Sequence, residues 1–182
     1  VPPAAGEVVS PVFGGFALTT ATSTRFAGSG LCASCHRADY TTNTNRDSAG
    51  EPVDLTADWA GSMMANSARD PYYLAVLSAE VAANPGHAGA IQGKCLTCHA
   101  PMAAYEAGGS LILADLQTSD LGKDGVSCVL CHRIEEANLG PSGLSYTGNF
   151  IIGDETGIDR KIYGPYASAA INPTPMINQV GF

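Results

Sequence analysis

The sequence is short of histidine, tryptophan and charge, and it has no long apolar run. Its 182 residues include 4 histidines and 1 tryptophan, and charged residues make up 14% of the chain. The 9 lysines and arginines stand against 17 aspartates and glutamates, a formal net charge of −8. Nucleic-acid binding needs a basic face, which this composition does not provide. We therefore expect no nucleic-acid partner.

The apolar stretches, such as Leu-Ile-Leu-Ala at residues 111–114, are far too short to cross a membrane. The chain starts at Val1, with neither a methionine nor a basic leader. This start is expected of an exported protein whose signal peptide has been removed. An acidic surface also gives no reason to bind anionic lipid. We expect a periplasmic or extracellular protein with no membrane span.

Cysteine is absent outside one motif, which occurs three times. Its copies are Cys32-Ala-Ser-Cys35-His36, Cys95-Leu-Thr-Cys98-His99 and Cys128-Val-Leu-Cys131-His132. Cys-x-x-Cys-His is the attachment sequence of c-type haem, in which two thiols bind the porphyrin as thioethers and the histidine ligates the iron. Two residues between the cysteines put both sulfurs on one side of a helical turn, and the next residue brings its imidazole under the iron.

Three other kinds of site use similar cysteine pairs. A single pair could be a thioredoxin-like redox centre, two pairs could hold zinc, and six cysteines could form three disulfides. Here every pair is followed at once by histidine, which favours haem. We therefore expect three heme c cofactors, bound by Cys32, Cys35, His36, Cys95, Cys98, His99, Cys128, Cys131 and His132.

Three haems in so short a chain would supply much of its core, which is compatible with 21 glycines and 11 prolines. We predict a mainly α-helical fold with much irregular structure, a small multihaem cytochrome c fold built around three covalent haems. Short β pieces are expected in the C-terminal region. The predicted organisation is an extended N-terminal arm at 1–30, a three-haem core at 31–137 and a haem-free region of loops and short strands at 138–182.

Local signals place the main elements. Asp70 suits a helix N-cap and Pro71 the first helical turn, while Asn84-Pro85-Gly86 ends the same helix. Further helices are expected at about 56–68, 95–106 and 128–136, and strands at about 11–18, 150–152 and 161–163. Only 28 residues separate His99 from Cys128, against 58 between His36 and Cys95. We therefore expect the second and third haems to be the closer pair.

Histidine is too scarce to ligate every haem twice. Three of the four histidines belong to the motifs, which leaves His87. Within one chain, at most one haem can then be bis-histidine. The others need a methionine, another donor, a residue of a partner chain, or an open position. We expect His87 to ligate the first or third haem rather than the second, which is its neighbour in sequence.

The four methionines are candidate thioether ligands, and histidine–methionine ligation raises the reduction potential relative to bis-histidine. Met63 and Met64 cannot both face the same way on a helix, so one of them is exposed or has a ligand role. Met102 is too close to His99 to reach the far face of the same haem, but it could serve a neighbouring one. Met176 lies in a proline-rich segment, where ordinary packing is the alternative.

Several other side chains have two possible roles. Arg37 and Arg133 each follow a motif histidine and are candidates to pair with haem propionates, with a plain surface position as the alternative. Trp59 is expected against a porphyrin or in the core. Packing or propionate binding, rather than electron relay, is expected of Tyr72, Tyr73 and Tyr105.

Three segments resemble a family of large multihaem c-type cytochromes exported by bacteria. They are Trp59-Ala-Gly-Ser-Met63-Met64-Ala-Asn-Ser-Ala-Arg69-Asp70-Pro71, Cys95-Leu-Thr-Cys98-His99-Ala-Pro101-Met102 and Asp124-Gly125-Val126-Ser127-Cys128-Val-Leu-Cys131-His132-Arg133. In related cytochromes a Trp-x-x-Ser-x-His segment supplies a distal histidine. The resemblance therefore puts Met64 at a distal-ligand position, and it implies electron transfer between oxidoreductases or out of the cell.

The leading prediction is electron transfer by a non-enzymatic periplasmic or extracellular carrier, with other redox proteins as partners. The alternative is a subunit of a polymeric extracellular filament or of a larger redox complex. In that case residues 1–30 and 138–182 would form interfaces, and His87 could ligate a haem of the next subunit. A haem enzyme acting on a small nitrogen or sulfur compound is less favoured, since no Cys-x-x-Cys-Lys motif occurs.

Overall fold

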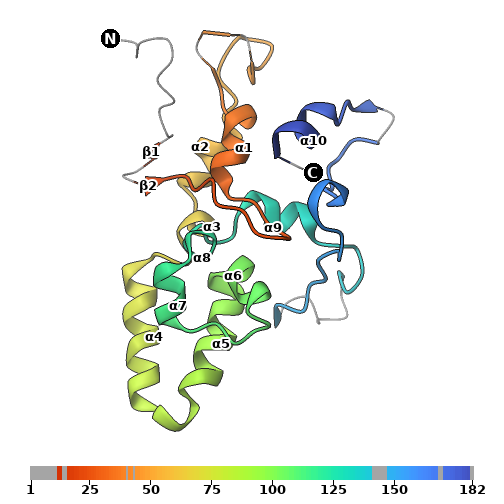
Figure 1. The fold of residues 1–182 in the computed structure, drawn as a ribbon. Helices are drawn as coiled ribbons and strands as arrows, with labels where there is room; N and C mark the ends of the chain where they lie inside the picture. Colours follow the sequence, from red (N-terminus) through yellow and green to blue (C-terminus); the bar gives the residue numbers. More distant parts are fainter. Residues whose placement is uncertain are drawn as a thin grey trace.

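The computed structural model describes residues 12–13, 16–39, 41–42, 44–140, 147–167 and 170–180. Short helices joined by irregular segments dominate this part of the chain (Figure 1). The α-helices are α1 (Ser29–His36), α2 (Leu55–Ala60), α3 (Met63–Asn66), α4 (Pro71–Ala83), α5 (Ala88–His99), α6 (Pro101–Glu106), α7 (Leu113–Thr118), α8 (Asp120–Lys123), α9 (Cys128–Arg133) and α10 (Thr174–Val180). Two 3₁₀ turns, η1 (Pro85–His87) and η3 (Gly157–Asp159), join them. Among the described residues, no helix is long and apolar enough to span a membrane.

Regular β structure is confined to the start of the described chain. Strands β1 (Val12–Phe13) and β2 (Phe16–Ala17) pair antiparallel, in the region where a strand was expected. In the described part of 138–182 no strand forms, so the expected strands at 150–152 and 161–163 are wrong. Only a single antiparallel bridge, Ile134 to Ile152, is found there. The mainly helical, irregular fold class is confirmed.

The α4–α5 hairpin begins and ends where the local signals predict. The Asp70 carboxylate accepts a hydrogen bond of 2.8 Å from the Tyr72 amide, and Pro71 occupies the first turn of α4. Asn84 ends α4, and η1 carries the chain into α5, which lies beside α4 (Figure 1). Leu77 of α4 and Leu96 of α5 are buried together in a core that also holds Ala100, Ala103, Ala104, Leu111 and Leu116.

Three predicted helices differ from the observed ones. The helix expected at 56–68 is interrupted at Gly61, and the Ser62 hydroxyl accepts from the Ala65 amide to cap α3 as a separate helix. The second motif closes α5 instead of opening a helix, because Pro101 cannot continue α5 and starts α6. The third motif helix, α9, ends at Arg133.

A second core joins segments far apart in the chain. Phe26, Met102, Val129 and Ile152 are all buried in it, and they come from the N-terminal segment, α6, α9 and the C-terminal region. The predicted arm, haem core and C-terminal region therefore pack against one another through their described residues. The three boundaries proposed for them stay a prediction.

Candidate haem-attachment sites

The three Cys-x-x-Cys-His motifs share one arrangement. The motif histidine is the last residue of α1 and of α5 and the last but one of α9, whose first residue is Cys128. In every motif the first cysteine is half-buried and the second is exposed. One thiol therefore lies against the protein and the other faces outward within the same helical turn. Two thiols on one side of a helix end, followed by an imidazole, are the groups that attach and ligate a c-type haem.

His99 is held on two sides. Its Nδ1–H donates a hydrogen bond of 2.9 Å to the Ser67 carbonyl. The Tyr73 ring stacks on the imidazole, with 3.6 Å between ring centroids and an interplanar angle of 2°. A carbonyl at Nδ1 fixes the tautomer and leaves Nε2 to ligate a metal, as in many metal-binding histidines. The His99 ring is therefore preset for ligation through Nε2.

His132 is preset in the same way by a different segment. Its Nδ1–H donates to the Tyr163 carbonyl at 2.6 Å, and the Tyr163 amide donates back to the His132 carbonyl at 2.7 Å. This reciprocal pair fastens the C-terminal region to the third motif. A cavity of about 600 Å³, lined in part by Ile134, Glu135 and Tyr163, opens beside it.

The first motif is held through its backbone. The Asn45 amide group donates to the carbonyls of Cys35 and Arg37, each at 2.7 Å, and the Thr56 hydroxyl donates to the His36 carbonyl at 3.2 Å. Asn45 can make both contacts because its own backbone takes a positive φ of 53°. Within the described chain, no hydrogen bond to the exposed His36 ring is found.

Helices α1 and α9 bring the first and third motifs into contact. The Cys32 and Cys128 thiols lie close enough to interact, and this interaction raises the pKa of Cys32 and lowers that of Cys128. Burial raises the pKa of Cys32 further. The expectation from chain spacing that the second and third haems are the closer pair stays a prediction, although the thiols that lie close together belong to the first and third motifs. Packing of α1 against α9 brings these two thiols together.

Helix α3 and the residues after it connect the second and third motifs. The Met64 carbonyl accepts from the Val126 amide at 3.0 Å, and the Ser67 carbonyl accepts from His99. Gly125 has a positive φ of 67°, and a Cβ there would lie 2.6 Å from the Met64 carbonyl oxygen. The Trp59 indole, expected against a porphyrin or in the core, donates to the Val126 carbonyl at 2.8 Å.

The structure brings only some of the candidate distal ligands near a motif histidine. Met63 and Met64 line one cavity of about 510 Å³ together with His99. The Met63 side chain is 90% exposed and that of Met64 is 52% exposed. Beside this cavity the Tyr73 hydroxyl is buried without a hydrogen-bond partner among the described residues. A cavity lined by two methionines and a motif histidine fits a haem.

The remaining candidates lie elsewhere. Met102 is fully buried in the second core, and Met176 of α10 packs against the same core. His87 is exposed at the turn between α4 and α5, about 18 Å along α5 from His99. The tip of the α4–α5 hairpin points away from α1 and α9 (Figure 1). Ligand roles for these three residues stay predictions.

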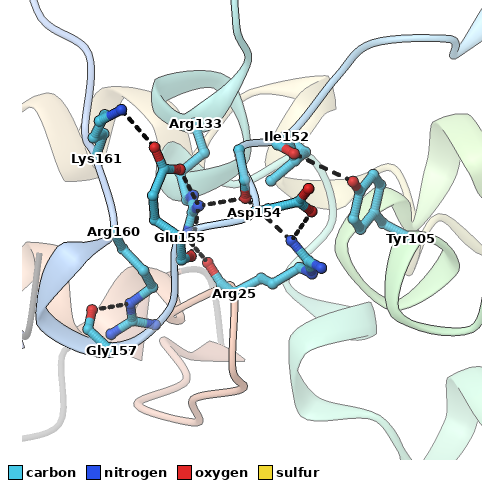
Figure 2. Close-up of polar contacts among 10 residues, drawn as sticks. Arg25, Tyr105, Arg133, Ile152, Asp154, Glu155, Gly157, Arg160 and Lys161 are labelled. Carbon is cyan, nitrogen blue, oxygen red and sulfur yellow. Dashed lines mark hydrogen bonds and ion pairs between the residues drawn. The ribbon is translucent and has the colours of Figure 1, made fainter.

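Arg133 is not a surface residue, so that alternative is wrong, while its pairing with a haem propionate stays a prediction. Its side chain is 1% exposed and donates to the carbonyls of Arg25 and Gly153 at 2.8 Å and of Glu155 at 3.1 Å. Figure 2 shows this guanidinium between the N-terminal segment and residues 153–155, beside the Arg25–Asp154 and Lys161–Glu155 ion pairs. Burial lowers the pKa of Arg133. The propionate role of Arg37 stays a prediction.

Sequence reasoning missed the groups that hold the motif histidines. Ser67 and Tyr163 act through backbone carbonyls, which every residue possesses and which leave no sequence signal. Tyr73 was expected only to pack or to bind a propionate, and nothing in the sequence shows that its ring covers His99. Its position follows from α4 packing against α5.

Comparison with known proteins adds one finding. A protein-family model described as cytochrome c554 and c-prime matches residues 31–133, more than half of the chain and all three motifs. No curated protein and no solved structure matches.

Proposed function

The chain belongs to the cytochrome c554 and c-prime family, and on that premise we propose that it passes electrons between redox proteins through three covalently bound c-type haems. Membership implies c-type haem and haem-based electron transfer. The observation that carries the proposal is the repeated site. Three cysteine pairs have the same half-buried and exposed order, and each precedes a histidine. Two of these imidazoles are fixed at Nδ1 by a carbonyl.

Each motif has a defined part in this proposal. The paired thiols hold the haem as thioethers, and His36, His99 and His132 are the proximal ligands. A bound haem supplies one-electron redox chemistry, and the protein sets its ligands, its surroundings and its neighbours. The Cys32–Cys128 contact makes the first and third attachment sites neighbours. Two haems attached there have a short path for an electron.

Met64 is the proposed distal ligand at the second motif. It lines the same cavity as His99, and its carbonyl is anchored by the Val126 amide. Met63 also lines this cavity, but its side chain is almost wholly in solvent. Histidine–methionine ligation would give the second haem a higher potential than a bis-histidine haem. For the two distal positions that remain, at the first and third haems, His87, Met102, Met176 and outside donors are hypotheses only.

The proposed location is periplasmic or extracellular, and the proposed partners are other redox proteins, with no nucleic acid involved. The excess of acidic residues favours partners with a basic docking face. No enzymatic activity is proposed.

One observation supports a second candidate function, assembly into a cytochrome filament or a larger redox complex. His87 is exposed at the end of a helical hairpin, where it could ligate a haem of another subunit. Size measured over a range of protein concentrations separates the two candidates, because an assembly grows with concentration and a monomeric carrier does not.

Haem stoichiometry tests the main proposal directly. Denaturing mass spectrometry of protein matured with the c-type attachment machinery is expected to show three covalent haems per chain. Magnetic circular dichroism of the ferric protein then counts bis-histidine, histidine–methionine and high-spin haems. Fewer than three covalent haems would refute the stoichiometry. A persistent high-spin haem in the intact protein would instead favour a haem enzyme that acts on a small molecule.

A further inference from the structure

Two groups from the chain after α3, the Ser67 carbonyl and the Tyr73 ring, contact the His99 side chain. The Ser67 carbonyl accepts a hydrogen bond from Nδ1 of the imidazole, and the Tyr73 ring covers one of its faces. We propose that Tyr73 is a positioning residue for the axial ligand of the second haem, which it holds in one orientation and shields from water. The proposal rests on the proposed function, since it requires a haem at Cys95 and Cys98.

The backbone on both sides of this contact is held firmly. The Ser67 hydroxyl donates to the His99 carbonyl at 2.8 Å, so Ser67 contacts both the main chain and the ring of His99. Three residues after Ser67, the Asp70 cap fixes the start of α4 and thereby the position of Tyr73. Tyr73 also packs against the core shared by α4 and α5. The stack is therefore built on two anchored segments.

The hydroxyl of Tyr73 does not account for its position. It is buried and has no hydrogen-bond partner among the described residues. Burial, with the Cys95 and Cys98 thiols nearby, raises the pKa of Tyr73. A buried hydroxyl without a partner is a cost to the folded state, and phenylalanine would fill the same space without it. The ring, and not the hydroxyl, makes the contact with His99.

A ring stacked at 3.6 Å has two physical consequences for the ligand. It prevents the imidazole from turning about its bond to the metal, since rotation would drive the two rings into each other. It also keeps water from one imidazole face and lowers the local dielectric. A ferric centre carries more positive charge than a ferrous one, so exclusion of water favours the reduced state. Loss of the ring is expected to lower the reduction potential of this haem.

The first test uses the wild-type protein in its reduced, diamagnetic state. At this ring separation, nuclear Overhauser effects are expected between Tyr73 ring protons and the carbon-bound ring protons of His99. Their absence, in protein shown by mass spectrometry to carry three haems, would overturn the stacking proposal and leave the proposed function intact. If the haem at Cys95 and Cys98 is missing by mass, the proposed function itself fails.

Two variants then separate the ring from the hydroxyl. Tyr73→Phe is expected to keep the wild-type ligand spectrum and all three potentials. Tyr73→Leu is expected to lower one of the three potentials and to change the ferric resonance signal of that haem alone. Tyr72→Leu is the matched control, since Tyr72 is the adjacent residue of α4 and 78% exposed, and it should change nothing. Equal effects of Tyr73→Phe and Tyr73→Leu, or no effect of Tyr73→Leu, would overturn the proposal.

Discussion

The thiols of Cys32 and Cys128 lie close enough to shift each other's pKa, although 96 positions separate them in the chain. Each is the inner, half-buried cysteine of its motif. Their contact follows from the packing of α1 on α9, with Phe26, Val129 and Leu130 buried beside them. The first and third attachment sites are thus adjacent, and the second is connected to them through α3.

This adjacency predicts which haems influence each other. Replacing Cys128 and Cys131 by serine removes the third haem, and we expect the potential of the first haem to change more than that of the second. The reason is that a charged ferric neighbour disappears from the site beside Cys32. Redox titration followed by nuclear magnetic resonance of the remaining haems measures both shifts. A larger shift at the second haem would contradict the predicted pairing.

Met64→Leu should remove one histidine–methionine signal from the near-infrared magnetic circular dichroism spectrum, because leucine has no sulfur to ligate iron. Met63→Leu is the matched control, and it should leave the spectrum unchanged because the Met63 side chain is mostly in solvent. If the control abolishes the signal and Met64→Leu does not, the ligand is Met63.

Arg133→Met should destabilise the fold by about 3 kcal/mol, since three carbonyls lose a charged donor. Urea unfolding followed by far-ultraviolet circular dichroism measures the change. Lys123→Met is the control, because its exposed ion pair with Asp120 contributes little to stability. Similar losses in the two variants would show that the buried guanidinium is not the main connection between α9 and residues 153–155.

We predict that the contact between Glu155 and Lys161 is sensitive to acid. The hydrogen bond from Lys161 holds the pKa of Glu155 below its ordinary value of 4.5. Its ionised form therefore contributes stability that is present above pH 4.5 and is lost as the pH falls through the lower, folded-state pKa. In urea unfolding between pH 6 and pH 3, wild type should lose stability more steeply than Glu155→Gln. Parallel pH profiles would refute this role.

Gly125→Ala tests the close approach of the third motif to α3. The new Cβ would contact the Met64 and Ala65 carbonyl oxygens at a positive φ, so we expect a loss of about 3 kcal/mol. Gly50→Ala is the matched control, since Gly50 also has a positive φ, of 83°, but nothing within 4 Å of its Cβ position. It should cost only about 1 kcal/mol of backbone strain, measured by the same urea unfolding. Equal losses of stability in the two variants would mean that the backbone around Gly125 has room for a methyl group.

Local features of this protein were readable from its sequence. The α4 boundaries follow from Asp70, Pro71 and Asn84, because caps and prolines act on neighbouring backbone groups. The break at Gly61 was missed, although the same kind of signal was present in Ser62. Strands expected at 150–152 and 161–163 did not form, because short apolar pieces need partner strands that these lack among the described residues.

The sequence by itself determined the attachment chemistry and the family, because Cys-x-x-Cys-His is a covalent pattern complete within five residues. Only the tertiary structure decided which motifs are neighbours, which carbonyls hold His99 and His132, and that Arg133 is buried. The physical reason is that these contacts join distant segments through packing and through backbone groups. Backbone carbonyls are the same at every residue, so no side-chain pattern can mark the ones that a histidine will meet.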